Sequence, residues 1–497
     1  MVDMAGPHKP LALRLTRELA PLTLTDWAAA CTDALAAGDR VLSLFGRKAD
    51  AAQVVVSAVL LRAAGGLEIL RGSGPVAGGY PSLTARFPAV QVLERELWEQ
   101  TGLVPHGHPW LKPVRFEGER QGRLHEYPFF PVRGQEVHEV GVGPIHASVI
   151  EPGHFRFMCH GEQVHHLEIQ LGYQHRGVEA LMLQRPPLAL TPLAETIAGD
   201  TSIAHAWACC AAVEALAGVQ LAPEVDLVRG IALELERIAM HLVAITGLAT
   251  DIAFLQGGAT YGRLRTAIIN ATMRVCGSRF GRGWLRPGGV RHGITPELRA
   301  DLLQTLAAFG RDFTEVNELM LAARSVRSRF QGVGVLGHQA ALDIGLQGLA
   351  ARACGVPIDT RASLPGRLYE RHPAEVLIEP GGDCWARLVL RMREIDASLR
   401  WLYAALAAGD TQLDGHALQA PDRLYPDTLC ISVREGFRGP VLHALETGPD
   451  GRLLHYKVQD PSLLNWFGLA LAVRDNEISD FPICNKSFDL SYCGNDL

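Results

Sequence analysis

A long helical pattern surrounds the segment Glu234-Leu235-Glu236-Arg237-Ile238-Ala239-Met240-His241-Leu242. Between residues 224 and 255, apolar side chains recur at three- and four-residue steps, which predicts a buried helix. Pro223 suits the first position of that helix, where no backbone N–H is needed. Glu234, Arg237 and His241 are three and four residues apart, so they share one face. Two interpretations stay open for these charges: an ion-paired network that fixes helix packing, or a proton path from a buried cavity to solvent.

The patterns on either side of this helix predict an α+β protein. An N-terminal small α/β module is followed by a mostly helical bundle domain with small peripheral β-sheets. In the module we expect a helix over 27–37, strands over 40–44, 53–61 and 67–70, and a glycine-rich turn over 72–79. Later helices are expected over 203–216, 261–276, 296–324, 340–352 and 383–406. Later strands are expected over 147–150, 155–159, 164–169, 428–435, 440–447 and 452–458.

Composition excludes several classes of function. The net charge is −6 and no long basic run occurs, so nucleic acid is not an expected partner. We expect no signal peptide, because residues 1–10 lack an apolar stretch, and no membrane span, because no run of about 18 apolar residues occurs. The ten cysteines form no C-x-x-C pair. They are typical of buried residues in a reduced, cytosolic protein.

Common cofactor motifs are absent from the sequence. Six histidines lie between residues 146 and 175, but their spacing does not favour a zinc site. No glycine-rich dinucleotide fingerprint opens a helix after a strand, and no phosphate-binding P-loop occurs. NAD, if the protein's reaction uses it, would therefore bind elsewhere in a complex.

Several motifs, in order along residues 140–497, resemble one protein family. They include Gly172-Tyr173-Gln174-His175-Arg176-Gly177, the segment around Arg237, and Glu435-Gly436-Phe437-Arg438-Gly439. This part of the chain resembles the large subunit shared by membrane-bound NiFe hydrogenases and the quinone-site subunit of respiratory complex I. The motif around Arg438 departs from the family pattern at Phe437, where the family has proline.

The first 135 residues resemble a second, smaller complex I subunit. The motifs are Tyr80-Pro81-Ser82-Leu83-Thr84, Glu94-Arg95-Glu96-Leu97 and Gly107-His108-Pro109-Trp110-Leu111. The resemblance implies two domains: a small-subunit-like α+β domain with an extended arm at 1–135, and the large-subunit-like helical domain at 140–497. Such a fusion is typical of formate-hydrogenlyase-type hydrogenases.

Two loops depart from the family where it matters most for chemistry. They are Glu195-Thr196-Ile197-Ala198-Gly199-Asp200-Thr201 and the stretch from Ser487 to Leu497. In the family these loops carry four cysteines that hold nickel and iron. Here the ligand positions fall on Ala198, Thr201, Ser491 and Gly494, and Cys493 is one place off the fourth. Since thiolates hold soft metals, the resemblance implies a chain without a nickel–iron centre.

The resemblance also gives candidates for residues that line the former metal cavity. They are Glu179, Arg352, Asp359, Arg438 and Asp489. If the cavity bound quinone instead, as in complex I, His146 or His154 could supply the histidine of the head-group site. The tyrosine of that site falls on Gly199, which has no side chain.

We therefore expect the fused hydrophilic large subunit of a membrane-associated, complex I-like oxidoreductase related to formate hydrogenlyase. Two alternatives stay open: a quinone reductase subunit with a rebuilt site, and a non-redox scaffold. The chain itself would bind no cofactor, although quinone is possible. Its expected partners are an iron–sulfur small subunit, which holds the cluster, and membrane-arm subunits. These would hold it at the cytoplasmic, inner face of the cell membrane.

Overall fold

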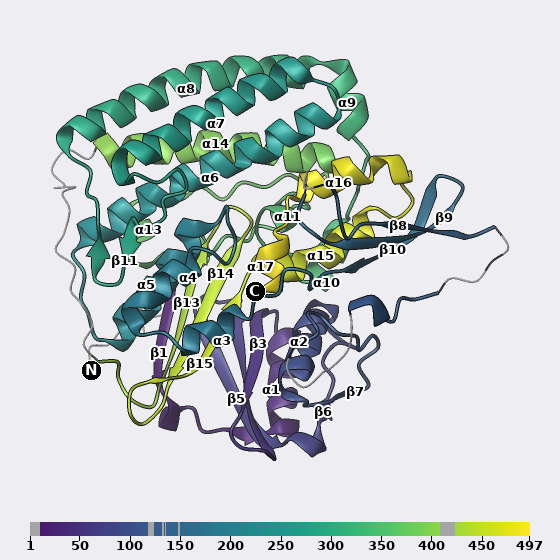
Figure 1. Ribbon diagram of the computed structural model, residues 1–497, viewed down its shortest axis with the longest axis vertical. Helices are drawn as coiled ribbons and strands as arrows, with labels where there is room; N and C mark the ends of the chain where they lie inside the picture. Colours follow the sequence, from purple (N-terminus) through teal and green to yellow (C-terminus); the bar gives the residue numbers. More distant parts are fainter. Residues whose placement is uncertain (1–9, 118–123, 132–133, 135, 148–149, 408–422) are drawn as a thin grey trace.

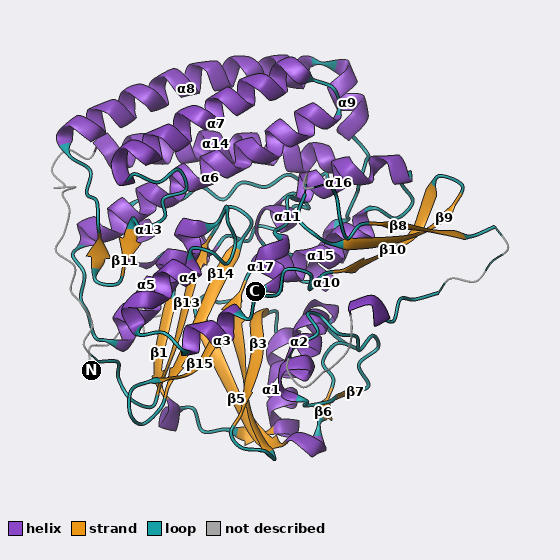
Figure 2. Cartoon of the chain, in the orientation of Figure 1, coloured by secondary structure: helices purple, strands orange, loops and turns teal. Residues whose placement is uncertain are grey.

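The computed structural model describes all residues except 1–9, 118–123, 132–133, 135, 148–149 and 408–422. A layer of long helices covers one side of the molecule, and a β-rich N-terminal module lies on the other (Figure 1). Between them lies a four-stranded sheet that contains strands from both ends of the chain (Figure 2). The α+β class, the N-terminal β/α module and the helical middle are confirmed.

The N-terminal module is a sheet of order β2-β5-β4-β3 that carries two helices. The helix α1 contacts β5, and α2 contacts β3. The glycine-rich turn predicted over 72–79 is wrong in its first half, because β5 continues to Pro75. A Cβ atom at Gly72 would lie 2.8 Å from the Trp27 side chain, so glycine lets that buried ring pack on the strand. The elements are β2 (Leu22–Thr23), α1 (Leu24–Ala36), β3 (Arg40–Lys48), β4 (Gln53–Leu61), β5 (Leu67–Pro75), β6 (Tyr80–Pro81), α2 (Gln91–Thr101) and β7 (Pro105–His106).

A three-stranded antiparallel sheet of order β10-β9-β8 follows: β8 (His138–Val142), β9 (His154–His160) and β10 (Gln163–Gln170). Residues 148 and 149 of the strand expected over 147–150 lie outside the described residues, and Ala147 is in a turn. The strand that pairs with β9 on this side is β8 instead. The segment between Val142 and His154 therefore connects the two strands of a hairpin.

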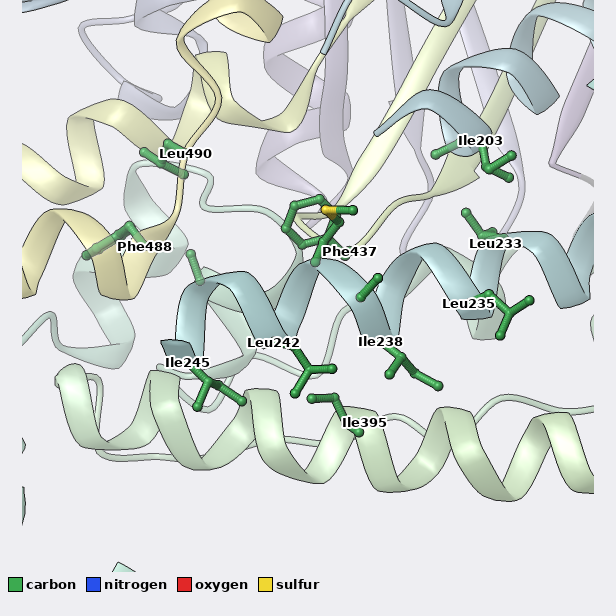
Figure 3. Packing of buried hydrophobic residues seen from close by; sticks show 14 of the residues in the cluster. Ile203, Leu233, Leu235, Ile238, Leu242, Ile245, Ile395, Phe437, Phe488 and Leu490 are labelled. Carbon is green, nitrogen blue, oxygen red and sulfur yellow. The ribbon is translucent and has the colours of Figure 1, made fainter. Parts of the chain in front are cut away.

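The bundle is built from α6, α7, α8 and α14, each of which contacts its neighbours along its length. On one side of α6, Ile395 of α14 packs near Leu242; on the other side lies Phe437 (Figure 3). The helix predicted over 340–352 is broken in two, because Gly345 and Gly348 adopt φ of +67° and +54°. The elements are α3 (Val178–Leu183), α4 (Leu190–Ala194), α5 (Ser202–Leu216), α6 (Pro223–Asp251), α7 (Leu255–Cys276), β11 (Leu285–Arg286), β12 (Gly289–Val290), α8 (Pro296–Ala322), α9 (Arg324–Phe330), α10 (His338–Asp343), α11 (Gly348–Arg352), α12 (Thr360–Ser363), α13 (Gly366–Arg371) and α14 (Cys384–Ala407).

The central sheet has the order β1-β13-β14-β15 and is antiparallel throughout. Its first strand comes from the start of the described chain, since Leu11 pairs with Ser432. In addition, Leu463 and Leu464 pack into the core of the N-terminal module. The division into domains at 135–140 stays a prediction. The elements are β1 (Leu11–Leu15), β13 (Thr428–Glu435), β14 (Pro440–Thr447), β15 (Leu453–Gln459), α15 (Pro461–Ala472), α16 (Phe481–Phe488) and α17 (Tyr492–Asp496).

Two general expectations can be compared with this fold. Within the described ranges, no helix combines the length and apolar character that a membrane span requires. All ten cysteines are buried and none forms a disulfide, which confirms that they act as buried residues.

Candidate functional site

The loop before α5 and the C-terminal stretch lie against each other. Arg438 joins them: its Nη1 donates to Thr201 Oγ1 at 3.3 Å, and its Nε donates to the Asp489 carbonyl oxygen. Arg176 makes a second link, since its Nη2 donates to the carbonyl oxygens of Ile197 (2.9 Å) and Cys493 (3.3 Å). The two loops that the resemblance singled out therefore form one site.

The four expected ligand positions offer no thiolate. Ala198 is fully buried, and Ser491 Oγ accepts a hydrogen bond from the Gly494 N–H at 2.9 Å, which caps α17. At Gly494, a Cβ atom would lie 2.7 Å from Asp460 Oδ2. The nearby sulfur atom is that of Cys493, 3.4 Å from Ser491 Oγ, and burial raises the pKa of its thiol to about 11. In the described parts of the chain, no group of three or more His, Cys, Asp or Glu side chains could hold a metal ion.

An arginine–aspartate pair occupies the junction of the two loops. Arg438 Nη1 and Nη2 donate to the two carboxylate oxygens of Asp200 at 2.8 and 2.6 Å, and the guanidinium lies 4.3 Å from the centre of the Phe437 ring. Burial disfavours the charge of Asp200, but Arg438 outweighs it, so the pKa of Asp200 is lowered. Asp489 also faces Arg438, with Oδ1 3.9 Å from Nη2, yet burial prevails and its pKa is raised.

A second cluster of charges lies deeper, between α6, α11 and α14. Arg352 is fully buried and pairs with Glu394 (2.6 Å), Glu435 (3.1 Å) and Asp359 (3.6 Å). Arg361 joins Asp359 to Glu234 at 2.7 and 3.1 Å. Every carboxylate in this cluster thus meets a guanidinium, as buried charges require. Of the two interpretations of the α6 charges, the ion-paired network describes these contacts.

His241 and Arg391 connect the two clusters. Arg391 Nη1 donates to His241 Nδ1 at 3.1 Å, so the proton of the neutral ring is on Nε2, which donates to Glu394 at 2.9 Å. Burial, together with Arg391 and Arg237, lowers the pKa of His241 to about 4 in spite of Glu394. The Arg391 Nη1 atom is also 3.9 Å from Asp489 Oδ2. Hydrogen bonds and ion pairs therefore run without interruption from Asp200 to Glu234.

The predicted site residues lie in four separate places. Arg438 and Asp489 lie at the loop junction, and Arg352 and Asp359 lie in the deeper cluster. Glu179 lies elsewhere, where it pairs with Lys457 at 3.0 Å and accepts from the Val458 N–H. The remaining two candidates lie on the β8–β9 hairpin, with ring nitrogens on backbone oxygens: His146 on Gly153 at 2.8 Å and His154 on Gly143 at 3.2 Å.

Sequence reasoning missed several buried polar residues of this region. Arg387, Arg391 and Glu394 stand at i, i+4 and i+7 of α14 and are buried, a spacing that could have indicated a charged face. The sequence analysis also did not predict a buried chain of hydrogen bonds. It runs from Asp460 to His205 (3.2 Å), His443 (3.1 Å) and the Tyr456 hydroxyl (2.8 Å). Its members are spread over 255 residues of sequence, so no local pattern signals it.

Comparison with known proteins supports a single family. Residues 251–426 match the family described as "Respiratory-chain NADH dehydrogenase, 49 Kd subunit". The chain is 30% identical over 440 residues to formate hydrogenlyase subunit 5 of Escherichia coli K12, which covers 83% of this chain and 76% of that protein. It is 29% identical over 434 residues to hydrogenase-4 component G of the same organism, covering 83% and 75%. With an NADH-quinone oxidoreductase subunit of Clostridium beijerinckii it shares 28% identity over 318 residues, covering 64% and 82%.

Proposed function

Because this chain belongs to the family of the complex I 49 kDa subunit and the NiFe hydrogenase large subunit, we propose that it is the hydrophilic large subunit of a complex I-like oxidoreductase assembly that works without a nickel–iron centre. The proposal includes the fusion: residues 1–135 take the part of the small complex I subunit, and residues 140–497 the part of the large one.

The observation that carries this proposal is the side-chain chemistry of the loop junction. A nickel–iron centre would need soft thiolate ligands, and alanine, threonine, serine and glycine supply none. Cys493 stands one position away, and burial favours its neutral thiol. Asp200 instead forms a paired, hydrogen-bonded contact with Arg438, which also donates to the Asp489 carbonyl oxygen and so links the two loops. The side chains at the four positions thus do not fit a nickel–iron centre. The ion pair between Asp200 and Arg438 instead holds the loops in place.

The proposed partners follow from the relatives. Formate hydrogenlyase subunit 5, hydrogenase-4 component G and the NADH-quinone oxidoreductase relative are, by their names, parts of multi-subunit enzymes. We propose that a small iron–sulfur subunit binds beside the loop junction of this chain. Membrane-arm subunits would hold the assembly at the cytoplasmic face of the membrane. In that setting the chain couples redox or conformational change to the membrane arm.

The second candidate is a quinone reductase with a rebuilt head-group site. It is favoured by Tyr492, which packs against the base of the hairpin that carries His146 and His154. A Cβ atom at Gly153 would lie 2.7 Å from the Tyr492 ring. Burial raises the pKa of Tyr492 to about 12, and its hydroxyl accepts from Asn485 Nδ2 at 3.2 Å, so its own proton stays free to donate. Quinone-dependent changes in the EPR signal of the nearest iron–sulfur cluster would select this candidate over a redox-silent scaffold.

Metal analysis tests the main proposal. The full chain, purified with the subunits that accompany it, is analysed for nickel by plasma mass spectrometry, next to a four-cysteine hydrogenase produced in the same host. We expect stoichiometric nickel in the hydrogenase and none in this chain, together with no H₂ uptake or evolution. Stoichiometric nickel in this chain would refute the proposal.

A further inference from the structure

Two cysteines from different helices meet beneath the loop that joins α9 to α10. Cys384 is the first residue of α14 and Cys484 lies in α16, and their sulfur atoms are 4.0 Å apart. The two helices contact each other (Figure 1), and both cysteines are fully buried. A disulfide has an S–S bond of about 2.05 Å. The sulfurs would therefore approach by roughly 2 Å to form one, which rotation of the two side chains can supply.

A buried arginine faces this pair. Arg387 is fully buried, and it forms no salt bridge with a carboxylate among the residues that the structure describes. It donates to Ser487 Oγ at 2.8 Å and to the backbone oxygens of Gly382 and Gly334, both at 2.9 Å. Its Nη2 also lies 3.5 Å from Cys384 Sγ. Because a buried charge needs an opposite charge beside it, the thiolate form of Cys384 is the counter-charge that Arg387 favours.

The surroundings of the two sulfurs favour one thiolate and one thiol. The hydrogen bond with Cys484 lowers the pKa of the Cys384 thiol to about 6, and Arg387 adds to this shift, although burial opposes it. The N-terminus of α14 also favours a thiolate at its first residue. The hydrogen bond with Cys384, together with burial, raises the pKa of Cys484. Burial raises the pKa of each of the other eight thiols, so Cys384 differs from all of them.

The loop between α9 and α10 covers the pair with a single layer of main chain. A Cβ atom at Gly334 would lie 2.7 Å from Cys484 Sγ and 3.3 Å from Cys384 Sγ, so this glycine lies directly over both sulfurs. In the same loop Gly332 is exposed and Val335 is 50% exposed. Local opening of a surface loop has a low free-energy cost compared with opening the core. Such an opening here is enough to admit a molecule as small as hydrogen peroxide.

We propose that Cys384 and Cys484 are a peroxide-sensitive dithiol that closes to a disulfide between α14 and α16. The Cys384 thiolate attacks one oxygen of hydrogen peroxide, so that an S–O bond forms, the O–O bond breaks and hydroxide leaves. The Cys484 sulfur then attacks the sulfur of the Cys384 sulfenic acid. The S–S bond forms, the S–O bond breaks, and the departing hydroxide takes the Cys484 proton and leaves as water. The two sulfurs are oxidised by two electrons in all, which the peroxide takes up.

This dithiol is independent of the proposed function, because neither cysteine belongs to the loop junction. The disulfide would join residues 100 positions apart in sequence. It would fix the start of α14 to the helix that leads into the C-terminal loop. The site is therefore one of reversible covalent modification, with hydrogen peroxide as the oxidant and a thiol as the reductant.

Peptide mapping tests the dithiol in the full chain, purified in the complex that it forms. The reduced protein is treated with hydrogen peroxide, its remaining thiols are blocked under denaturing conditions, and it is digested with trypsin. We expect peptide 372–387 linked to peptide 475–486, and release of both by dithiothreitol. Cys384 should be oxidised roughly tenfold faster than Cys354 or more, because the thiolate is the reactive form. The dithiol does not exist if the linked peptide is absent, or if both cysteines are oxidised at the same rate.

Two variants separate the reaction steps. Cys484→Ser keeps a hydrogen-bond donor but removes the second sulfur, so Cys384 should stay a sulfenic acid that dimedone labels. The matched control is Cys354→Ser. Burial raises the pKa of that thiol to about 11 despite Arg387, and its sulfur donates to the Ala350 carbonyl oxygen at 3.3 Å, so its loss should leave the linked peptide unchanged.

Absence of the dimedone adduct from Cys384 in the Cys484→Ser variant would overturn the assignment, and so would loss of the linked peptide in the Cys354→Ser variant. The wild-type peptide map decides the question even if either variant does not fold, because it needs no substitution.

Discussion

Replacing Arg438 by alanine should destabilise the protein more than any exposed arginine would. The side chain is 5% exposed and makes four hydrogen bonds at once: two with Asp200, one with Thr201 and one with the Asp489 carbonyl oxygen. Its loss leaves Asp200 without a counter-charge and removes one of the two arginine links between the loops, the other being Arg176.

The magnitude follows from the burial of the two partners. Removing one member of a fully buried ion pair costs about 3–5 kcal/mol. The Asp200 side chain, however, is 38% exposed, so water can replace part of what Arg438 provides. We therefore expect Arg438→Ala to lower the free energy of unfolding by about 2–3 kcal/mol. Asp200→Ala should cost about 1 kcal/mol less, because Arg438 keeps the Asp489 carbonyl and carboxylate as partners.

Urea unfolding of wild type, both single variants and the double variant measures the pair directly. We expect the double variant to cost less than the sum of the single ones, by about 1 kcal/mol or more, since residues in contact are not additive. Arg452→Ala serves as the exposed control and should stay within about 0.5 kcal/mol of wild type. If Arg438→Ala matches that control, or if the two single effects simply add, the Arg438–Asp200 contact does not hold the loops together.

Three further predictions concern the same region. The pKa of His241 is lowered to about 4 from an ordinary value of about 6.5. Between these pH values the unfolded chain binds a proton at His241 and the folded chain does not, so stability falls as the pH decreases from 6.5 to 4. Urea unfolding at several pH values should show wild type losing about 3 kcal/mol more than His241→Gln between pH 6.5 and pH 4; parallel curves would mean that the ring is protonated in the fold. Gly348→Ala should lower the free energy of unfolding by about 1–3 kcal/mol more than Gly332→Ala does. Both glycines have positive φ, but only at Gly348 would a Cβ atom lie 2.0 Å from the Arg438 carbonyl oxygen. Equal melting temperatures of the two variants would contradict this prediction. Finally, we expect no nickel in the quadruple variant Ala198→Cys, Thr201→Cys, Ser491→Cys and Gly494→Cys, even when it is expressed with hydrogenase maturation factors. The reasons are that Asp460 crowds position 494 and that Asp200 holds Arg438 in the junction. H₂ oxidation by this variant would show that the missing cysteines alone account for the loss of hydrogenase activity.

The parts of the fold that the sequence predicted well are those with a strong local pattern. The strands β4, β13 and β14 have the predicted bounds, because their β-branched and apolar runs end at turn residues. The start of α6 at Pro223 was likewise predicted. The break between α10 and α11 was not, since the apolar pattern continues across Gly345 and only the backbone conformation interrupts the helix.

The candidate site was predicted less completely than the fold, because its contacts join distant parts of the sequence. Arg438 and Asp489 were expected near each other from the resemblance, and they are. The acid that Arg438 actually pairs with, Asp200, is 238 residues away in sequence. Long-range pairing of this kind depends on tertiary structure, which no spacing rule encodes. The roles of the individual site residues stay predictions.

The position of β1 has a consequence for how this protein is made. The Thr16 N–H donates to the carbonyl oxygen of Asp427, 411 residues further along the chain. A ribosome that adds about 5–20 residues per second needs roughly 20–80 s between these two residues. During that time the N-terminal module can fold around its own core, while Leu11–Leu15 has no strand to pair with. An unpaired apolar strand is prone to aggregate. Pairing with β13 removes this exposed edge, and it becomes possible only when most of the chain has been made.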